Sequence, residues 1–146
     1  MSQNYLSILQ RVYNLLNSCP DPDKRDTAKE GWSVKEIVGH LIDSCSNNHQ
    51  RLSRYQANGN LEFPGYDQLQ FVRRAHYASY NFATMLILWF NYNKLLLHMI
   101  DHIPPQELQS TLSIGDRPTI TLAALVEDYF AHMEIHEEQI KRIINA

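Results

Sequence analysis

The stretch TLAALVEDYFAHMEIHEEQIKRII, residues 121–144, has the apolar spacing of a long amphipathic helix. Thr121 is a suitable N-cap, so we expect the helix to begin directly after it and to end near Ile144. At about 100° per residue, a set of apolar residues shares one face of this helix: Leu122, Leu125, Val126, Tyr129, Met133, Ile140 and Ile143. A helix with one apolar face needs other elements to cover it.

Three more segments have helical patterns. Residues 3–17 are followed by two prolines, which end a helix, and a second helix begins at Ser33, which has Glu36 in the position of a capping box. That helix continues to near Gln56. The third, roughly residues 80–102, is the most apolar, and we expect it to be central. Together, the four helices predict an all-α protein built as a four-helix bundle.

The two longer connections have different patterns. The segment LEFPGYDQLQFVRRAHY, residues 61–77, includes a Pro-Gly turn and is of mixed polarity, which predicts a long loop with about one helical turn. The segment LQSTLSIGDRPTITL, residues 108–122, alternates around Gly115 and Asp116, which predicts a short extended or hairpin-like excursion before the last helix. Pro118 argues against a robust sheet there.

Composition limits the class of protein. A chain of 146 residues with 44% apolar residues predicts one folded domain over residues 1–146. A net charge of −3 with scattered basic pairs argues against nucleic-acid binding. The longest apolar run, residues 85–90, is too short to cross a membrane, and the first residues do not resemble a signal peptide, so we expect a cytoplasmic protein. Cys19 and Cys45 are expected to be small buried side chains.

Two pairs of histidines have the spacing of metal ligands. His136 lies within the apolar face of the last helix and His132 at its edge, so both face the interior, where neutral imidazoles four residues apart can converge on one ion. His98 and His102 have the same spacing but lie far from the apolar face of their helix. We expect that pair to face solvent near a helix C-terminus. His49 and His76, without partners, are expected at the surface or at a pocket rim.

A third ligand cannot be chosen by periodicity. His40 lies about 130° from the centre of the apolar face of its helix, at about 100° per residue. A residue at the side of the apolar face can still point into the interior of a bundle, because each helix there packs against two neighbours. On the residues alone, His132 and His136 are therefore either two ligands of an incomplete site or two histidines that have this spacing by coincidence.

Motifs in two helices, taken together, resemble the DinB/YfiT-like superfamily of metal-dependent four-helix-bundle enzymes. The second helix has a Trp-Ser entry followed by His-Leu-Ile-Asp, and the last has a Thr-Leu start, the two histidines and then Gln-Ile. The likeness spans nearly the whole chain. The matching residues are Trp32, Ser33, His40, Leu41, Ile42, Asp43, Thr121, Leu122, His132, His136, Gln139 and Ile140.

The resemblance implies a metal site and a partner. Carried over residue by residue, His40, His132 and His136 coordinate one divalent metal ion, Zn²⁺ or Ni²⁺ first, with Fe²⁺ or Mn²⁺ as alternatives. Relatives of this kind tend to be homodimers, and those with known activities include thiol transferases and isomerases that use low-molecular-weight thiols. Three histidines leave a coordination position for water or substrate, which is typical of catalytic metal sites.

Three functions are compatible with such a site. The first is a transferase that joins a low-molecular-weight thiol, as co-substrate, to a small electrophile, because metal coordination favours the thiolate. The second is a metal-dependent hydrolase with the same ligands. The third is a non-catalytic, stress-associated helical dimer in which the metal is structural or vestigial. The residues alone do not separate the two reactions, and they assign no catalytic residue.

Residues around the ligands are weaker candidates. We consider Asp43, Asp128 and Glu134 as acceptors for the distal imidazole N–H, although solvated helix charges are the more frequent role for Asp43 and Glu134. Pocket walls are expected from the long loop and the third helix. The candidates for contacts with an anionic or thiol substrate are Tyr66, Arg73, His76 and Tyr77.

Overall fold

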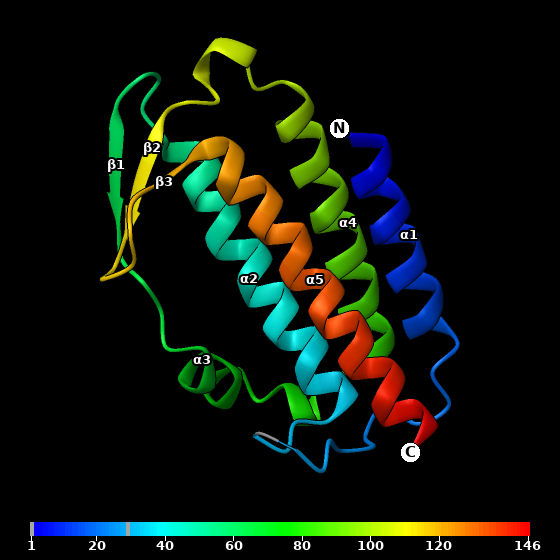
Figure 1. Ribbon diagram of the computed structural model, residues 1–146. Coiled ribbons are helices and arrows are strands. Elements are labelled where there is room, and N and C mark those ends of the chain that lie inside the picture. The colour runs from blue at the N-terminus through cyan, green and yellow to red at the C-terminus, as the bar shows by residue number, and fades with distance from the viewer. Residues whose placement is uncertain (1, 29) are drawn as a thin grey trace.

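Four long helices lie side by side in the computed structural model, which describes residues 2–28 and 30–146 (Figure 1). α1 and α2 each pack against both α4 and α5, so α1 lies diagonally across the bundle from α2. Figure 1 shows that α2 and α4 run in one direction, and α1 and α5 in the other. The predicted four-helix bundle is confirmed. The helices are α1 Ser2–Asn17, α2 Val34–Arg54, α4 Phe82–Asp101 and α5 Leu122–Asn145.

The predicted helix starts are confirmed by their caps. The Glu36 backbone N–H donates to Ser33 Oγ at 3.1 Å, and the Ser33 N–H donates to the Glu36 carboxylate at 3.2 Å, which completes the capping box of α2. Thr121 Oγ1 accepts from the N–H of Ala124 at 3.1 Å and caps α5. Both caps satisfy N–H groups that have no partner within the helix.

The connection between α2 and α4 contains more structure than the predicted loop with one turn. It holds a strand β1 (Asn60–Phe63), a two-turn helix α3 (Gln68–Ala75) and a short 3₁₀ helix η1 (Tyr77–Ser79). α3 forms because the Asp67 carboxylate accepts from two N–H groups of its first turn and because Val72 is buried. A helix this short has too few apolar positions to show a period in the sequence.

The excursion before α5 is a hairpin, as predicted, and it belongs to a small sheet. β2 (Thr111–Ile114) pairs antiparallel with β3 (Ile120–Thr121) and parallel with β1, in the order β1-β2-β3. A further 3₁₀ turn, η2 (Pro105–Glu107), precedes it. The parallel pairing was not predicted, because β1 and β2 belong to connections on either side of α4. The helical class stands, with this sheet added at one end of the bundle (Figure 1).

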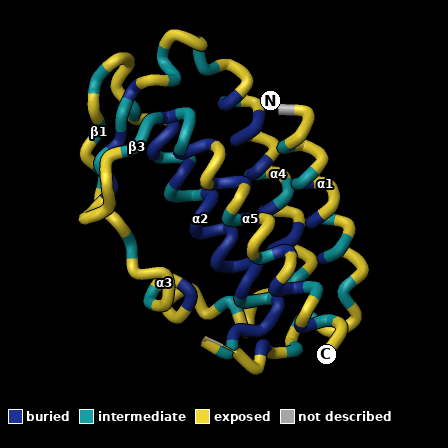
Figure 2. Tube along the Cα trace, in the orientation of Figure 1, coloured by how far each residue is buried: buried dark blue, intermediate teal, exposed yellow. Residues whose placement is uncertain are grey.

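The central helix is α2. The expectation that the segment near residues 80–102 would be central is wrong, because Ile87, Leu88 and Leu95 of α4 are exposed. α2 is buried along most of its length (Figure 2), since α3, η1 and β1 cover the side that α4 and α5 leave open. Its flank positions are therefore interior positions.

Within residues 2–28 and 30–146, no helix combines the length and apolar character that a membrane span requires.

Candidate metal centre

The structure brings His40, His132 and His136 together, although His40 comes from α2 and the other two from α5. His132 Nε2 lies 3.2 Å from His40 Nε2 and 3.0 Å from His136 Nε2. One nitrogen from each ring lies within 4.8 Å of the others. The three imidazoles therefore direct Nε2 toward a common centre.

The dimensions of this cluster fit a metal ion. Zinc–nitrogen bonds of about 2.0–2.1 Å in a tetrahedral site place the ligand nitrogens roughly 3.3 Å apart. The Nε2–Nε2 distances from His132 to His40 and to His136, 3.2 and 3.0 Å, are close to that value. The cluster could hold a divalent metal ion, and three histidine nitrogens would leave the fourth corner of the tetrahedron open.

His40 is 1% exposed, because its helix is covered on the flank as well as on the apolar face. The Trp32 ring, at the entry to α2, lies 5.1 Å from the His40 ring between centroids. At Gly39, the residue before His40, an added Cβ atom would lie 2.1 Å from the Tyr77 ring. Glycine at this position therefore lets Tyr77 pack directly on the helix beside His40.

Gln139 fixes the orientation of His136. The Gln139 side-chain N–H donates to the Asp26 carboxylate at 2.8 Å, so the amide oxygen is the atom that lies 2.7 Å from His136 Nδ1. His136 Nδ1 therefore carries the proton, and Nε2 presents its lone pair to the centre. Arg142 also donates to Asp26 at 3.0 Å. Sequence reasoning gave Gln139 no role; its position three residues after His136 was the available signal.

Two of the histidines are held neutral. Burial, with smaller contributions from His136 and His132, lowers the pKa of His40 to about 3. Burial, followed by the charge of His136, lowers the pKa of His132 to about 4. The neutral imidazole is the form that binds metal, so both rings are ready to act as ligands at neutral pH.

The structure places the three carboxylates that were considered as acceptors for the imidazole N–H groups in different surroundings. Asp43 is buried, and Tyr77 Oη donates to it at 2.6 Å, so the expectation of a solvated charge is wrong for this residue. Burial raises the pKa of Asp43 to about 6. Glu134 is half exposed and pairs with Arg11, which confirms a solvated charge. Asp128 is exposed. In the part of the chain that the structure describes, neither Asp43 nor Asp128 accepts a hydrogen bond from a histidine of the cluster.

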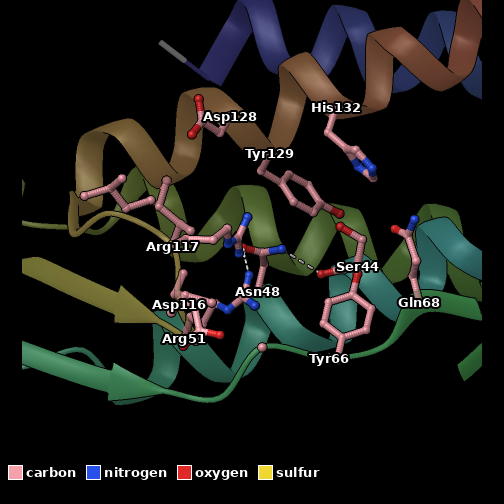
Figure 3. Close-up of a pocket in the computed structure, with 15 residues that line it drawn as sticks. Ser44, Asn48, Arg51, Tyr66, Gln68, Asp116, Arg117, Asp128, Tyr129 and His132 are labelled. Carbon is pink, nitrogen blue, oxygen red and sulfur yellow. Dashed lines mark hydrogen bonds between the residues drawn. The ribbon is translucent and has the colours of Figure 1, made fainter. Parts of the chain in front are cut away.

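A pocket of about 490 Å³ adjoins the cluster, between α2, α5 and the segments that precede α3 and follow β2 (Figure 3). His132 lines one side of it. Of the four predicted wall residues, Tyr66 lines the pocket. Arg73 and His76 are exposed on α3 and at its end, and Tyr77 binds Asp43. The polar residues that line the pocket and were not predicted include Ser44, Asn48, Arg51 and Arg117.

The other histidines lie elsewhere. His98 and His102 are exposed, as predicted, and His102 Nδ1 lies 2.8 Å from the carbonyl oxygen of His98 at the end of α4. His49 is half-buried, and its Nδ1 lies 2.9 Å from Tyr92 Oη. Cys45 is buried, and Cys19 is half-buried.

The likeness to known proteins is structural. No protein-family model matches the sequence, and no curated protein matches it. Among solved structures, YfiT from Bacillus subtilis matches with a TM-score of 0.79 and 19% identity, over 97% of this chain and 85% of that one. YfiT is described as a probable metal-dependent hydrolase with an unusual four-helix bundle topology. The match shows that this chain has the four-helix-bundle fold of YfiT, which is the fold that the sequence motifs predicted.

Proposed function

We propose that this protein is a metal-dependent enzyme in which His40, His132 and His136 bind one divalent metal ion beside a small-molecule pocket. The convergence of three Nε2 atoms next to that pocket is the observation that carries the proposal. Zn²⁺ and Ni²⁺ are the first candidates, since imidazole nitrogens suit both, and Fe²⁺ and Mn²⁺ are the alternatives.

The residues of the chain prepare the site before a substrate arrives. Gln139 and Asp26 hold His136 in one tautomer, and burial keeps His40 and His132 neutral. When bound, the metal would lower the pKa of a thiol or a water molecule at the open position. Asp43, one turn after His40, has a pKa of about 6 and can take up or release a proton near neutral pH.

Two reactions follow from this arrangement. Transfer of a low-molecular-weight thiol to a small electrophile is our first proposal, and its support is the sequence resemblance to a family that includes thiol transferases. Hydrolysis is the second, and its support is the shared fold with YfiT, itself described as a probable metal-dependent hydrolase. The third reading, a non-catalytic helical dimer, predicts no turnover that depends on the cluster.

Activity assays distinguish the transferase, the hydrolase and the non-catalytic dimer. Metal-loaded protein is incubated with 1-chloro-2,4-dinitrobenzene, with and without glutathione, bacillithiol or mycothiol, and separately with p-nitrophenyl acetate in water. Thiol-dependent consumption of the first substrate that His136→Ala abolishes supports the transferase. Hydrolysis of the ester without thiol, again abolished by His136→Ala, supports the hydrolase. Rates that are equal in the wild type and in His136→Ala on every substrate would contradict both enzymatic proposals.

We also propose a homodimer. Ile87, Leu88 and Leu95 give α4 an exposed apolar face, which supports a contact with a second copy. Light scattering on the wild type and on Leu88→Glu checks this: we expect a dimer and a monomer, and a monomeric wild type would contradict the proposal. A cytoplasmic location and the lack of nucleic-acid partners stay predictions from the sequence.

A further inference from the structure

Arg51 of α2 lines the same pocket as His132. The residue is only 3% exposed, yet its Nε and Nη2 atoms have no hydrogen-bond partner among the residues that the structure describes. The one hydrogen bond of its guanidinium to a described residue is a long one of 3.4 Å, from Nη1 to Asn48 Oδ1. Burying a charged group with unsatisfied donors is costly, so the unpaired state of this guanidinium needs an explanation.

No carboxylate of the described residues compensates this charge. Within residues 2–28 and 30–146, neither Arg51 nor Arg117 forms an ion pair with a carboxylate. Asp116 and Asp128 also line the pocket, but both are exposed to solvent. The Phe63 ring covers one face of the Arg51 guanidinium, whose central carbon lies 5.4 Å from the ring centroid. The edge with Nε and Nη2 therefore has no partner among the described residues.

A second cation shares this part of the pocket. Arg117, an exposed residue in the turn after β2, also lines it, and Figure 3 shows its side chain reaching toward Asn48 and Arg51. Burial, followed by the charge of Arg117, lowers the pKa of Arg51 from its ordinary value. Two guanidinium groups of like charge repel each other, and an anion bound between them would relieve that repulsion.

We propose that Arg51, assisted by Arg117, binds the carboxylate or phosphoryl group of a small molecule whose reactive end lies at the three-histidine centre. The inference rests on the proposed function for the reactive end. A guanidinium edge matches either anion with two parallel hydrogen bonds. The substrate class is therefore an anionic small molecule.

The geometry also limits the shape of that molecule. Arg51 follows His40 by eleven positions on α2, about 16 Å of helical rise before the reach of the side chains is subtracted. In Figure 3, His132 lies on one side of the pocket and Arg51 with Arg117 on the other. A ligand that reaches both must be elongated, with its anion at the end opposite the reacting group.

Binding of simple anions tests the subsite. Inorganic phosphate and succinate are titrated separately into the zinc-supplemented protein and followed by NMR chemical shifts. The matched control for Arg51→Met is Arg54→Met, an exposed arginine three residues further along the same helix. We expect the wild type and Arg54→Met to bind at least one anion equally, Arg51→Met to bind it at least about tenfold more weakly, and Arg117→Met to bind it about threefold more weakly. The anion that binds identifies the headgroup.

A stability measurement separates a ligand-binding arginine from a structural one. Because Arg51→Met removes a buried charge with unpaired donors, we expect its Tm to equal or exceed that of the wild type. Arg51→Lys keeps the charge without the planar fork, and we expect an intermediate loss of anion affinity. If Arg51→Met fails to fold, Arg51→Lys and Arg117→Met decide the question. A wild type that binds neither anion, or anion affinity unchanged in all Arg51 and Arg117 variants, would overturn the proposal.

Zinc uptake is measured on the same samples. We expect Arg51→Met to take up zinc as the wild type does. Zinc uptake with anion binding that is independent of Arg51 would defeat this inference and leave the metal proposal intact. If the wild type takes up no zinc but binds an anion in a way that depends on Arg51, the metal proposal fails and the anion subsite stands.

Discussion

Two pairs of histidines in this protein have the same sequence spacing and nearly the same separation. The ring centroids lie 4.4 Å apart for His98 and His102 in α4, and 4.5 Å apart for His132 and His136 in α5. The α4 pair lies at an exposed helix end, where His102 Nδ1 lies next to the helix's own carbonyl oxygen of His98. The α5 pair faces α2 inside the bundle.

The surroundings of the α5 pair account for the difference. His40 brings a third Nε2 atom to within 3.2 Å of His132, and Gln139 holds the proton of His136 on Nδ1. In both α4 and α5, two histidines four residues apart supply two imidazole nitrogens. A third ligand and an orienting partner turn such a pair into a candidate metal centre.

The largest effect is expected from removing the third ligand. His40→Ala leaves the α5 pair with two nitrogens, like the α4 pair, so we expect zinc affinity to fall by at least about 100-fold. Competition with a chromophoric chelator measures the affinity. His49→Ala, on the same helix and outside the cluster, is the control and should bind as the wild type does. Equal affinities for wild type and His40→Ala would show that the pair needs no third ligand.

A smaller loss is expected from removing the orienting partner. Gln139→Leu frees the His136 ring to adopt either tautomer, and we expect zinc affinity to fall about tenfold. Glu138→Gln, on the neighbouring exposed residue, serves as the control. If the two variants bind zinc equally well in the same chelator assay, Gln139 does not orient the ligand.

The pH profile should show the smallest effect near neutrality. Because the pKa of His40 is about 3 and that of His132 about 4, protons compete for these ligands only in acid. Between about pH 7 and 5, at most one of the three ligands can therefore bind a proton, and we expect zinc affinity to fall by no more than about tenfold per pH unit. Three histidines with the usual pKa of about 6.5 would all bind protons in this range, so a loss much steeper than about tenfold per pH unit in the chelator assay would contradict the lowered pKa values.

The same shift makes the stability of the metal-free protein depend on pH. Between about pH 6.5 and the lowered pKa values, these two histidines bind protons in the unfolded chain but stay neutral in the folded protein. Folding stability contributed by His40 and His132 is therefore present above about pH 6.5 and is lost as the pH falls toward 4 and 3. Urea unfolding of chelator-treated protein at several pH values measures this, and His132→Ala should show a smaller decrease.

The sequence was sufficient for the features that depend on local patterns. The caps Ser33 and Thr121 and the inward direction of the α5 pair follow from nearby residues, and the structure agrees with them. Features that depend on distant segments were not predictable. The burial of His40 requires Trp32 and Tyr77 on the flank of α2, which a helical wheel does not represent.

The pocket shows the same limitation. Charged residues are normally exposed, so no pattern in the sequence marks Arg51 as a buried residue. Its burial depends on β1 and on the turn after β2. These segments come together because β1 pairs in parallel with β2, although α4 separates the two strands in the sequence. The wall residues Arg73 and His76 were predicted from their place in the long loop. The helix α3, which is longer than the one predicted turn, carries Arg73 and ends at His76, and both residues are exposed.

Zinc content compared between the two pairs tests the central claim most directly. Untagged wild type, the double variant His132→Ala/His136→Ala and the matched double variant His98→Ala/His102→Ala are supplemented with zinc, desalted and analysed by mass spectrometry. We predict about one equivalent in the wild type and in the α4 variant, and less than about a tenth in the α5 variant. A wild type with less than about a tenth of an equivalent, or an α5 variant that keeps its zinc, would contradict the three-histidine centre.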